Sequence, residues 1–158
     1  MPSTAALTER SDLKAIAIGG LVSGTADLIF AILYYGRNGA TPAGILHSIA
    51  AGLLGRKVAY DGGVPTAVLG FGLHFLISCT ATTVYLLMSR KIPLLREKPL
   101  PCGILYGALV YFFMNMVVLP LSAHHAQAFP PPLAVAPIAI HLLGIGLPIA
   151  FAVKKFAR

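Results

Sequence analysis

Four long apolar segments, separated by polar, basic or proline-rich stretches, dominate the hydrophobic pattern of this chain. They run from about 15 to 35, 65 to 88, 101 to 121 and 132 to 153. Each holds about 20 mostly apolar residues, the length that an α-helix needs to cross a bilayer core of about 30 Å. The pattern predicts a single all-α membrane domain, built as a four-transmembrane-helix bundle.

Local signals support the ends of these segments. The pair Tyr34-Tyr35 closes the first segment, where amphipathic rings suit the membrane interface. The turn Asp61-Gly62-Gly63 opens the second. Pro137 and Pro148 predict kinks in the fourth. The first segment exceeds the roughly 7 to 15 apolar residues of a signal-peptide core, so we expect it to remain as a span.

The segment from about 41 to 57 has an apolar face but is too short for a full hydrophobic crossing. Thr41 can cap a helix that has Pro42 in its first turn. One face carries Ile45, Leu46, Ile49 and Leu53, and the other carries His47, Ser48, Ala51 and Gly55. Arg56-Lys57 is expected to end this helix. We predict an interfacial or re-entrant helix between the first two spans.

Composition agrees with the membrane assignment. The 158 residues are 57% hydrophobic and 11% charged, and their mean hydropathy is +0.82, which excludes an ordinary soluble domain. The net charge of +7 comes from basic residues beside apolar runs. That placement indicates membrane orientation, and no nucleic-acid partner is predicted. Cys79 and Cys102 fit neither a disulfide framework nor a metal motif.

The basic residues also predict the topology, because cytoplasmic loops carry an excess of Lys and Arg. With four spans and a cytoplasmic N-terminus, nine of the twelve lie inside: Arg10, Lys14, Arg90, Lys91, Arg96, Lys98, Lys154, Lys155 and Arg158. Arg37, Arg56 and Lys57 lie outside. A five-span chain with its N-terminus outside would divide them eight to four. We therefore expect four spans with both termini in the cytoplasm.

Two small-residue motifs, Gly20-x-x-x-Gly24 and Gly103-x-x-x-Gly107, lie in the first and third spans. Residues without bulky side chains at this spacing let two helices approach closely in lipid. The faces that carry these glycines are therefore expected to point into the bundle.

Each span also contains one polar residue that lipid penalises: Asp27, His74, Asn115 and His141. At a rise of about 1.5 Å per residue, all four lie roughly 9 to 14 Å below the outer surface. Small residues flank three of them at helical spacing: Gly20 and Gly24 beside Asp27, Gly70 and Ser78 beside His74, and Gly144 beside His141. The pattern predicts one polar cluster inside the outer half of the bundle.

Several chemistries suit such a cluster. Asp27, His74 and His141 could bind Zn, Fe or Mn, since carboxylate and imidazole are suitable ligands, or they could relay protons. His74 and His141 could instead be axial ligands of a b-type haem. His47, with His124 and His125 of the outer loop, could first bind the cation. The alternative is packing, in which each interhelical hydrogen bond contributes about 0.6 to 2 kcal/mol.

Catalytic signatures are not found in the sequence. It contains no H-E-x-x-H, no G-x-S-x-G, no Walker loop and no pair of intramembrane aspartates, so no enzymatic activity is predicted. The expected function is to bind or conduct a small cation in the lipid bilayer, as a homo-oligomer or with partner membrane subunits. The rival is an accessory or assembly subunit with a purely structural polar core.

Several motifs in the second half support a family resemblance: His74-Phe75-Leu76-Ile77, Gly103-Ile104-Leu105-Tyr106-Gly107, Met114-Asn115-Met116 and Ile140-His141-Leu142-Leu143. Over roughly residues 70 to 150 the chain resembles the YagU-like family of small bacterial inner-membrane proteins. The resemblance implies this fold and an inner-membrane location. It carries no activity over to this chain.

Overall fold

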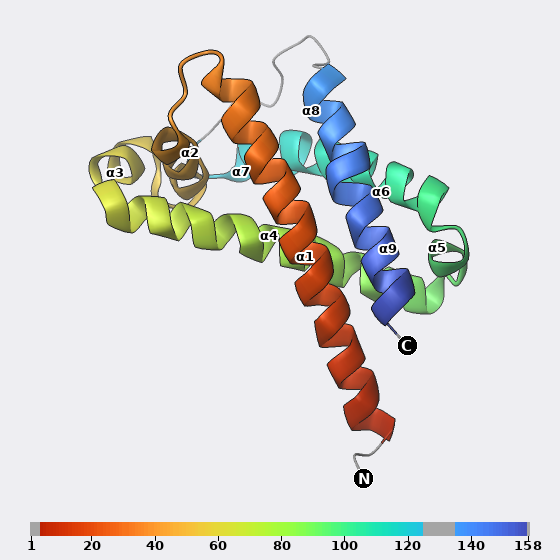
Figure 1. The fold of residues 1–158 in the computed structure, drawn as a ribbon. Helices are drawn as coiled ribbons and strands as arrows, with labels where there is room; N and C mark the ends of the chain where they lie inside the picture. Colours follow the sequence, from red (N-terminus) through yellow and green to blue (C-terminus); the bar gives the residue numbers. More distant parts are fainter. Residues whose placement is uncertain (1–3, 125–134, 158) are drawn as a thin grey trace.

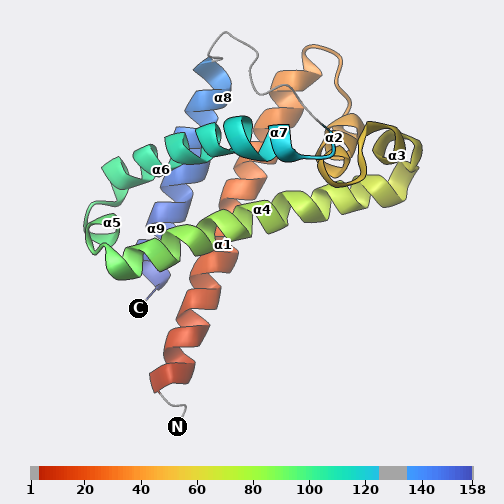
Figure 2. The same cartoon turned by 180° about the vertical axis from the view of Figure 1, so that it is seen from behind.

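The computed structural model describes residues 4–124 and 135–157. Within these ranges the chain is helical and contains no strand (Figures 1 and 2). Four stretches are long and apolar enough to cross a membrane: Glu9–Gly36, Gly63–Lys91, Pro99–Leu121 and Val135–Phe156. The predicted fold class and the number of spans are confirmed, although residues 132–134 of the predicted fourth span lie outside the described residues.

The first two spans are single helices, α1 (Thr4–Gly36) and α4 (Gly63–Lys91). The other two change helix type along their length. In the third, α6 (Pro99–Phe113) continues through the π-helical stretch η1 (Met114–Val118) into α7 (Leu119–Leu121). In the fourth, α8 (Val135–Ile140) is followed by the π-helical η2 (His141–Gly146) and by α9 (Leu147–Phe156). A π-helical stretch thus lies between Pro137 and Pro148, and the kinks of the fourth span remain a prediction.

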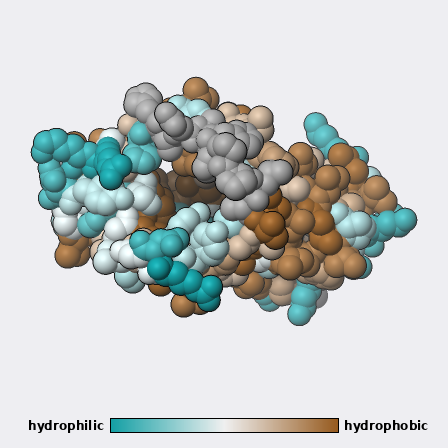
Figure 3. All heavy atoms as spheres, turned by 90° about the horizontal axis from the view of Figure 1, so that it is seen from above, coloured by the Kyte–Doolittle hydropathy of each residue, from teal (hydrophilic) through white to brown (hydrophobic). Residues whose placement is uncertain are grey.

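The spans form two layers that cross obliquely. One layer contains α1 and the antiparallel helix α8–η2–α9, and the other contains α4 and α6–η1–α7 (Figures 1 and 2). Between the layers, α1 packs on α4 and α6 packs on η2 and α9, while α1 also packs on α9 within its own layer. Large apolar side chains remain exposed on all four spans. Figure 3 shows hydrophobic side chains between two hydrophilic extremes, a surface suited to lipid.

The two ends of the bundle differ in charge. The start of α1, the short helix α5 (Leu94–Glu97) and the end of α9 lie at one end (Figure 1). We call this the basic end, because it carries the described residues Arg10, Lys14, Arg90, Lys91, Arg96, Lys98, Lys154 and Lys155. The opposite end, which we call the α2 end, contains the end of α1, the helices α2 (Pro42–Leu54) and α3 (Arg56–Asp61), and α7.

The main hydrophobic core lies in the half of the bundle next to the basic end. It consists of Tyr85, Leu86, Tyr106, Ile145, Ile149, Ala150 and Val153. The rings of Tyr85 and Tyr106 meet edge to face with centroids 4.9 Å apart. Their hydroxyl groups donate to the carbonyl oxygens of Leu95 (2.8 Å) and Ala81 (2.6 Å). These bonds join α4, α5 and α6, so this half is packed from several elements.

Both small-residue motifs lie at close helix contacts. A Cβ added at Gly20 would lie 2.5 Å from Cys79 Sγ of α4, and one at Gly24 would lie 2.9 Å from the Phe75 ring. A Cβ at Gly107 would overlap the carbonyl oxygen of His141 on η2. The predicted inward orientation of these glycine faces is therefore confirmed.

The short helix after the first span differs from the prediction. Thr41 caps it as expected, because its Oγ1 accepts a hydrogen bond of 3.0 Å from the Gly44 N–H. The expected end at Arg56-Lys57 is wrong. The helix α2 ends at Leu54, because the next residue, Gly55, has a φ of 78°. Arg56 and Lys57 instead begin α3, where Lys57 pairs with Asp61 at 2.6 Å.

Candidate functional site

His74 joins the first two spans. Its Nε2 lies 2.8 Å from the carbonyl oxygen of Gly24 and must donate to it, since a carbonyl only accepts. The helices can approach this closely because residue 24 has no side chain, so its backbone faces α4. The N–H on Nε2 leaves a lone pair on Nδ1 when the ring is neutral. The hydrogen bond therefore holds the His74 ring against α1. Among the described residues, Nδ1 has no hydrogen-bond partner.

Asp27 lies one helical turn beyond this contact on α1 and is half-buried. In the part of the chain that the structure describes, its carboxylate has no hydrogen bond and no ion pair. The preceding residue, Ala26, faces the fourth span, since its Cβ would lie 3.5 Å from a Cβ at Gly144. Asp27 thus follows α1 residues that contact α4 and η2, and in the described chain it makes no polar contact to either.

His141 and Asn115 make local hydrogen bonds in the two π-helical stretches. Asn115 Nδ2 donates to the Tyr111 carbonyl oxygen at 2.8 Å, and His141 Nδ1 donates to the Pro137 carbonyl oxygen at 2.8 Å. The His141 ring also meets the Tyr111 ring edge to face, with centroids 5.1 Å apart. The ring contact of Tyr111 with His141 thus joins α6 to η2. Among the described residues, His141 Nε2 has no hydrogen-bond partner and can accept.

The structure therefore gathers the expected cluster only in pairs. His74 contacts α1 near Asp27, and His141 contacts Tyr111 near Asn115. Among the described residues, no three His, Cys, Asp or Glu side chains lie close enough together to hold a metal ion. Asp27, His74 and His141 thus do not form one ligand set within the described chain. The haem hypothesis remains a prediction.

The half of the bundle that carries these polar residues is weakly packed. No described residue from 25 to 36, from 114 to 121 or from 135 to 144 is buried. Every buried residue of α1 lies at or before Gly24, and those of the fourth span begin at Ile145. We call these three ranges the open half. Asp27, Asn115 and His141 lie in the open half, and each of these residues is half-buried.

His47, which the sequence predicted to help form an entry site for the cation, lies apart from the polar residues of the spans. Its Nε2 lies 2.9 Å from the Gly63 carbonyl oxygen at the start of α4, and its ring centroid is 5.5 Å from that of Tyr60. Gly63 precedes His74 by eleven residues, roughly 16 Å along α4 at about 1.5 Å per residue. His47 also borders a shallow apolar groove of about 510 Å³, lined further by Ala43, Leu46, Val64, Ala67, Val68 and Phe71.

The expected cation site of the outer loop remains a prediction. His124 is half-buried beside Ala123, whose N–H donates to the Gly52 carbonyl oxygen of α2 at 2.9 Å. His125 lies outside the described residues. The hydrogen bond nevertheless fastens the end of the third span to the short helix.

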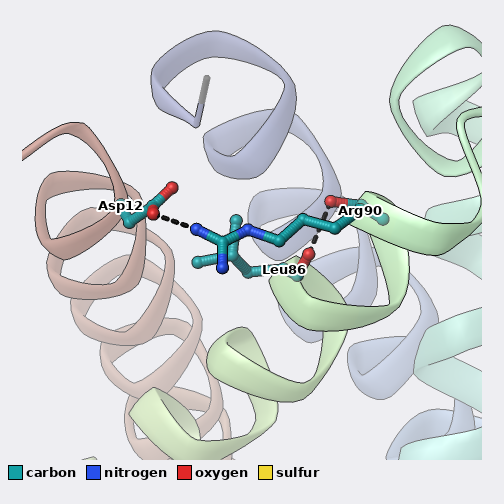
Figure 4. A network of polar contacts seen from close by, with 4 residues as sticks. Asp12, Leu86 and Arg90 are labelled. Atoms are coloured by element: carbon teal, nitrogen blue, oxygen red, sulfur yellow. Dashed lines mark hydrogen bonds and ion pairs between the residues drawn. The ribbon is translucent and has the colours of Figure 1, made fainter. Parts of the chain in front are cut away.

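An ion pair that sequence reasoning missed lies at the basic end. Asp12 of α1 pairs with Arg90 of α4 (Figure 4). The Asp12 side chain is only 12% exposed and that of Arg90 is 45% exposed. The signal was present in the sequence, because Asp12 lies on one helical stripe with the small residues Ala15, Gly19 and Ser23. A carboxylate on a packed stripe predicts a basic partner across the helix contact.

Comparisons with other proteins add no assignment to this geometry. No protein-family model, curated protein or solved structure matches the chain. The case for a function therefore rests on the contacts described above.

Proposed function

We propose that this chain is an accessory or assembly subunit of a membrane complex, and that neighbouring membrane helices cover its open half. The observation that carries the proposal is that polar residues of three spans lie in the open half, where these spans bury none of their described residues. Asp27, Asn115 and His141 lie where no described residue of their own spans is buried. A charged group in lipid costs about 2.5 to 3.5 kcal/mol at mid-helix depth. Covering this half with further helices removes the polar groups from lipid.

The hydrogen bonds of the other polar residues support a structural role. His74, Asn115 and His141 each donate to a backbone carbonyl, and the His74 bond joins two spans. The two bonds within a helix orient their side chains, and the His74 bond holds two helices in register and contributes about 0.6 to 2 kcal/mol. Asp27 differs from them, because its carboxylate has no partner in the described chain. It is the group that we expect to contact a donor on the neighbouring helix.

The same carboxylate supports a second candidate function, the binding or conduction of a metal ion or proton. Asp27 is the only acidic residue that lies deep within a span, one turn from the His74 contact. Among the described residues, the second ring nitrogens of His74 and His141 have no hydrogen-bond partner. A cation held there would draw its remaining ligands from water or from a second copy of the chain.

We further propose that the protein resides in a bacterial inner membrane with its basic end in the cytoplasm. The excess of Lys and Arg at that end supports this orientation. The resemblance to YagU-like proteins supports the choice of membrane.

Native mass spectrometry of the full chain, purified in mild detergent, tests the assembly proposal. We expect wild type to be released as a complex larger than one chain and Asp27→Leu to be released largely as single chains. Thr80→Leu is the matched control, because Thr80 is an exposed polar residue of α4 that lies outside the open half. It should leave the complex intact. A wild type that is a single chain with a bound metal ion, lost in Asp27→Asn, would overturn the assembly proposal and support the cation site.

A further inference from the structure

The basic end contains a pocket that the polar cluster does not use. Its volume is about 360 Å³, and it is lined by Pro93, Arg96, Glu97, Lys154 and Ala157. The lining comes from two elements that pack on each other, α5 with its preceding turn and the end of α9. Ligand pockets commonly begin at about 300 Å³, so the space suits a small polar group rather than a single water molecule.

The charge lining this pocket is positive. Arg96 and Lys154 face it from different elements, and within residues 4–124 and 135–157 neither has an ion-pair partner. Glu97 is the one acidic lining residue. Asp12, at the same end of the bundle, is already paired with Arg90. Two cations against one carboxylate leave a net attraction for an anion.

The pocket also lies at the depth of the lipid headgroups. Lys91 ends α4 and Pro99 begins α6, so α5 connects two spans where both leave the apolar region. Lys14 and Lys155 lie over the Phe156 ring, at 5.1 and 5.3 Å from its centroid. Aromatic and basic side chains together are typical of the membrane interface. A lipid beside these spans would place its phosphate at this level.

We propose that the pocket between α5 and α9 binds the phosphate group of an anionic phospholipid. Arg96 can donate two parallel hydrogen bonds to phosphate oxygens, and Lys154 adds a mobile positive charge. Basic pockets between membrane helices commonly bind such headgroups. The volume exceeds what one bare ion needs, which favours a headgroup over free phosphate. The inference rests on the membrane-spanning fold and is independent of the assembly proposal.

The test uses the full chain in detergent and counts retained lipids by native mass spectrometry. Phosphatidylglycerol, phosphatidylcholine and inorganic phosphate are added separately at equal concentration. Wild type should retain one phosphatidylglycerol in clear preference to the other two. The double variant Arg96→Gln/Lys154→Gln should bind it about 10- to 30-fold more weakly, the effect of losing two cations near anionic lipid. Arg56→Gln/Lys57→Gln removes the same charge at the α2 end and should bind as wild type does.

A gain of affinity separates binding from misfolding. Glu97→Gln removes the acidic group of the pocket and should bind phosphatidylglycerol severalfold more tightly than wild type, which a damaged fold cannot produce. Equal retention of phosphatidylglycerol and phosphatidylcholine would overturn the proposal. So would equal losses in the two double variants, or binding of inorganic phosphate without binding of phosphatidylglycerol.

Discussion

Single polar atoms join the elements of this protein, and Tyr106 provides the clearest case. Its buried hydroxyl donates across the bundle from α6 to the Ala81 carbonyl oxygen of α4, at 2.6 Å. In an apolar environment the alternative to this bond is an unpaired donor, so the bond stabilises the contact between the two spans beside the Tyr85–Tyr106 ring contact. The sequence marks Tyr106 as a span residue but cannot identify its acceptor.

Removing this hydroxyl should therefore weaken the fold. We expect Tyr106→Phe to lower the free energy of unfolding by about 1 kcal/mol, the usual net contribution of such a hydrogen bond. Unfolding of the detergent-solubilised protein by a denaturing detergent, followed by circular dichroism, measures the change. Tyr111→Phe is the control, since the Tyr111 hydroxyl has no hydrogen bond among the described residues. Equal losses in both variants would contradict the assignment.

Residue patterns in the sequence predicted some of the site and missed the rest for a physical reason. Asp27, His74, Asn115 and His141 are recognisable because lipid penalises them. Their mutual distances depend on how each helix is rotated, which a spacing of 3.6 residues per turn gives only for regular α-helices. Asn115 and His141 lie in π-helical stretches, where hydrogen bonds run from i to i+5 and the faces shift. The predicted single cluster is therefore divided into pairs.

At the scale of elements, glycine positions determine how closely the spans approach. Gly24 faces α4 and Gly107 faces η2, each where a side chain would overlap the neighbouring helix. These contacts were predictable, because the small-xxx-small spacing identifies a packing face without knowledge of the partner. The helix break at Gly55 could not be predicted, because nothing in the sequence distinguishes a glycine with positive φ from a glycine within a helix.

The glycine contacts give a prediction with an internal control. Gly24→Leu and Gly107→Leu should each lower the free energy of unfolding by about 3 kcal/mol or more, since overpacking costs about 1 to 3 kcal/mol even where neighbours can move. Gly72→Leu introduces the same side chain on α4 where a Cβ would meet no atom within 4 Å, so it should be tolerated. Yield and elution volume in detergent report the outcome. Normal behaviour of both test variants would show that those faces look toward lipid.

At the scale of the whole molecule, most of the positive charge and the main hydrophobic core both lie toward the basic end of the bundle. The basic end is next to the tyrosine core, and the open half lies toward the α2 end. The sequence predicted four spans and a gathering of basic residues, because hydropathy and charge act along the chain. It could not predict the uneven packing, which depends on side chains from α4, α6 and α9 meeting in three dimensions.

The proposed orientation is testable with reporter fusions. Fusions after Arg96 and after the last residue should report the same side of the membrane, the cytoplasm, because an even number of spans separates them. A fusion after Lys57 should report the opposite side. If the first two fusions report opposite sides, another segment crosses the membrane, and α2 becomes the first candidate.

The position of α9 in the core also has a consequence for synthesis. Ile149, Ala150 and Val153 are synthesised after the first three spans, yet they belong to one core with Tyr85 of α4 and Tyr106 of α6. The first three spans therefore lie in the membrane with these packing surfaces uncovered until the fourth span is made. The helix α1 can pack on α9 only after that step. A nascent or truncated chain that lacks the fourth span exposes Tyr85 and Tyr106 to lipid with their core unfilled. Such chains should be the preferred substrates of membrane proteases, and insertion of the fourth span becomes the event that protects the protein from degradation.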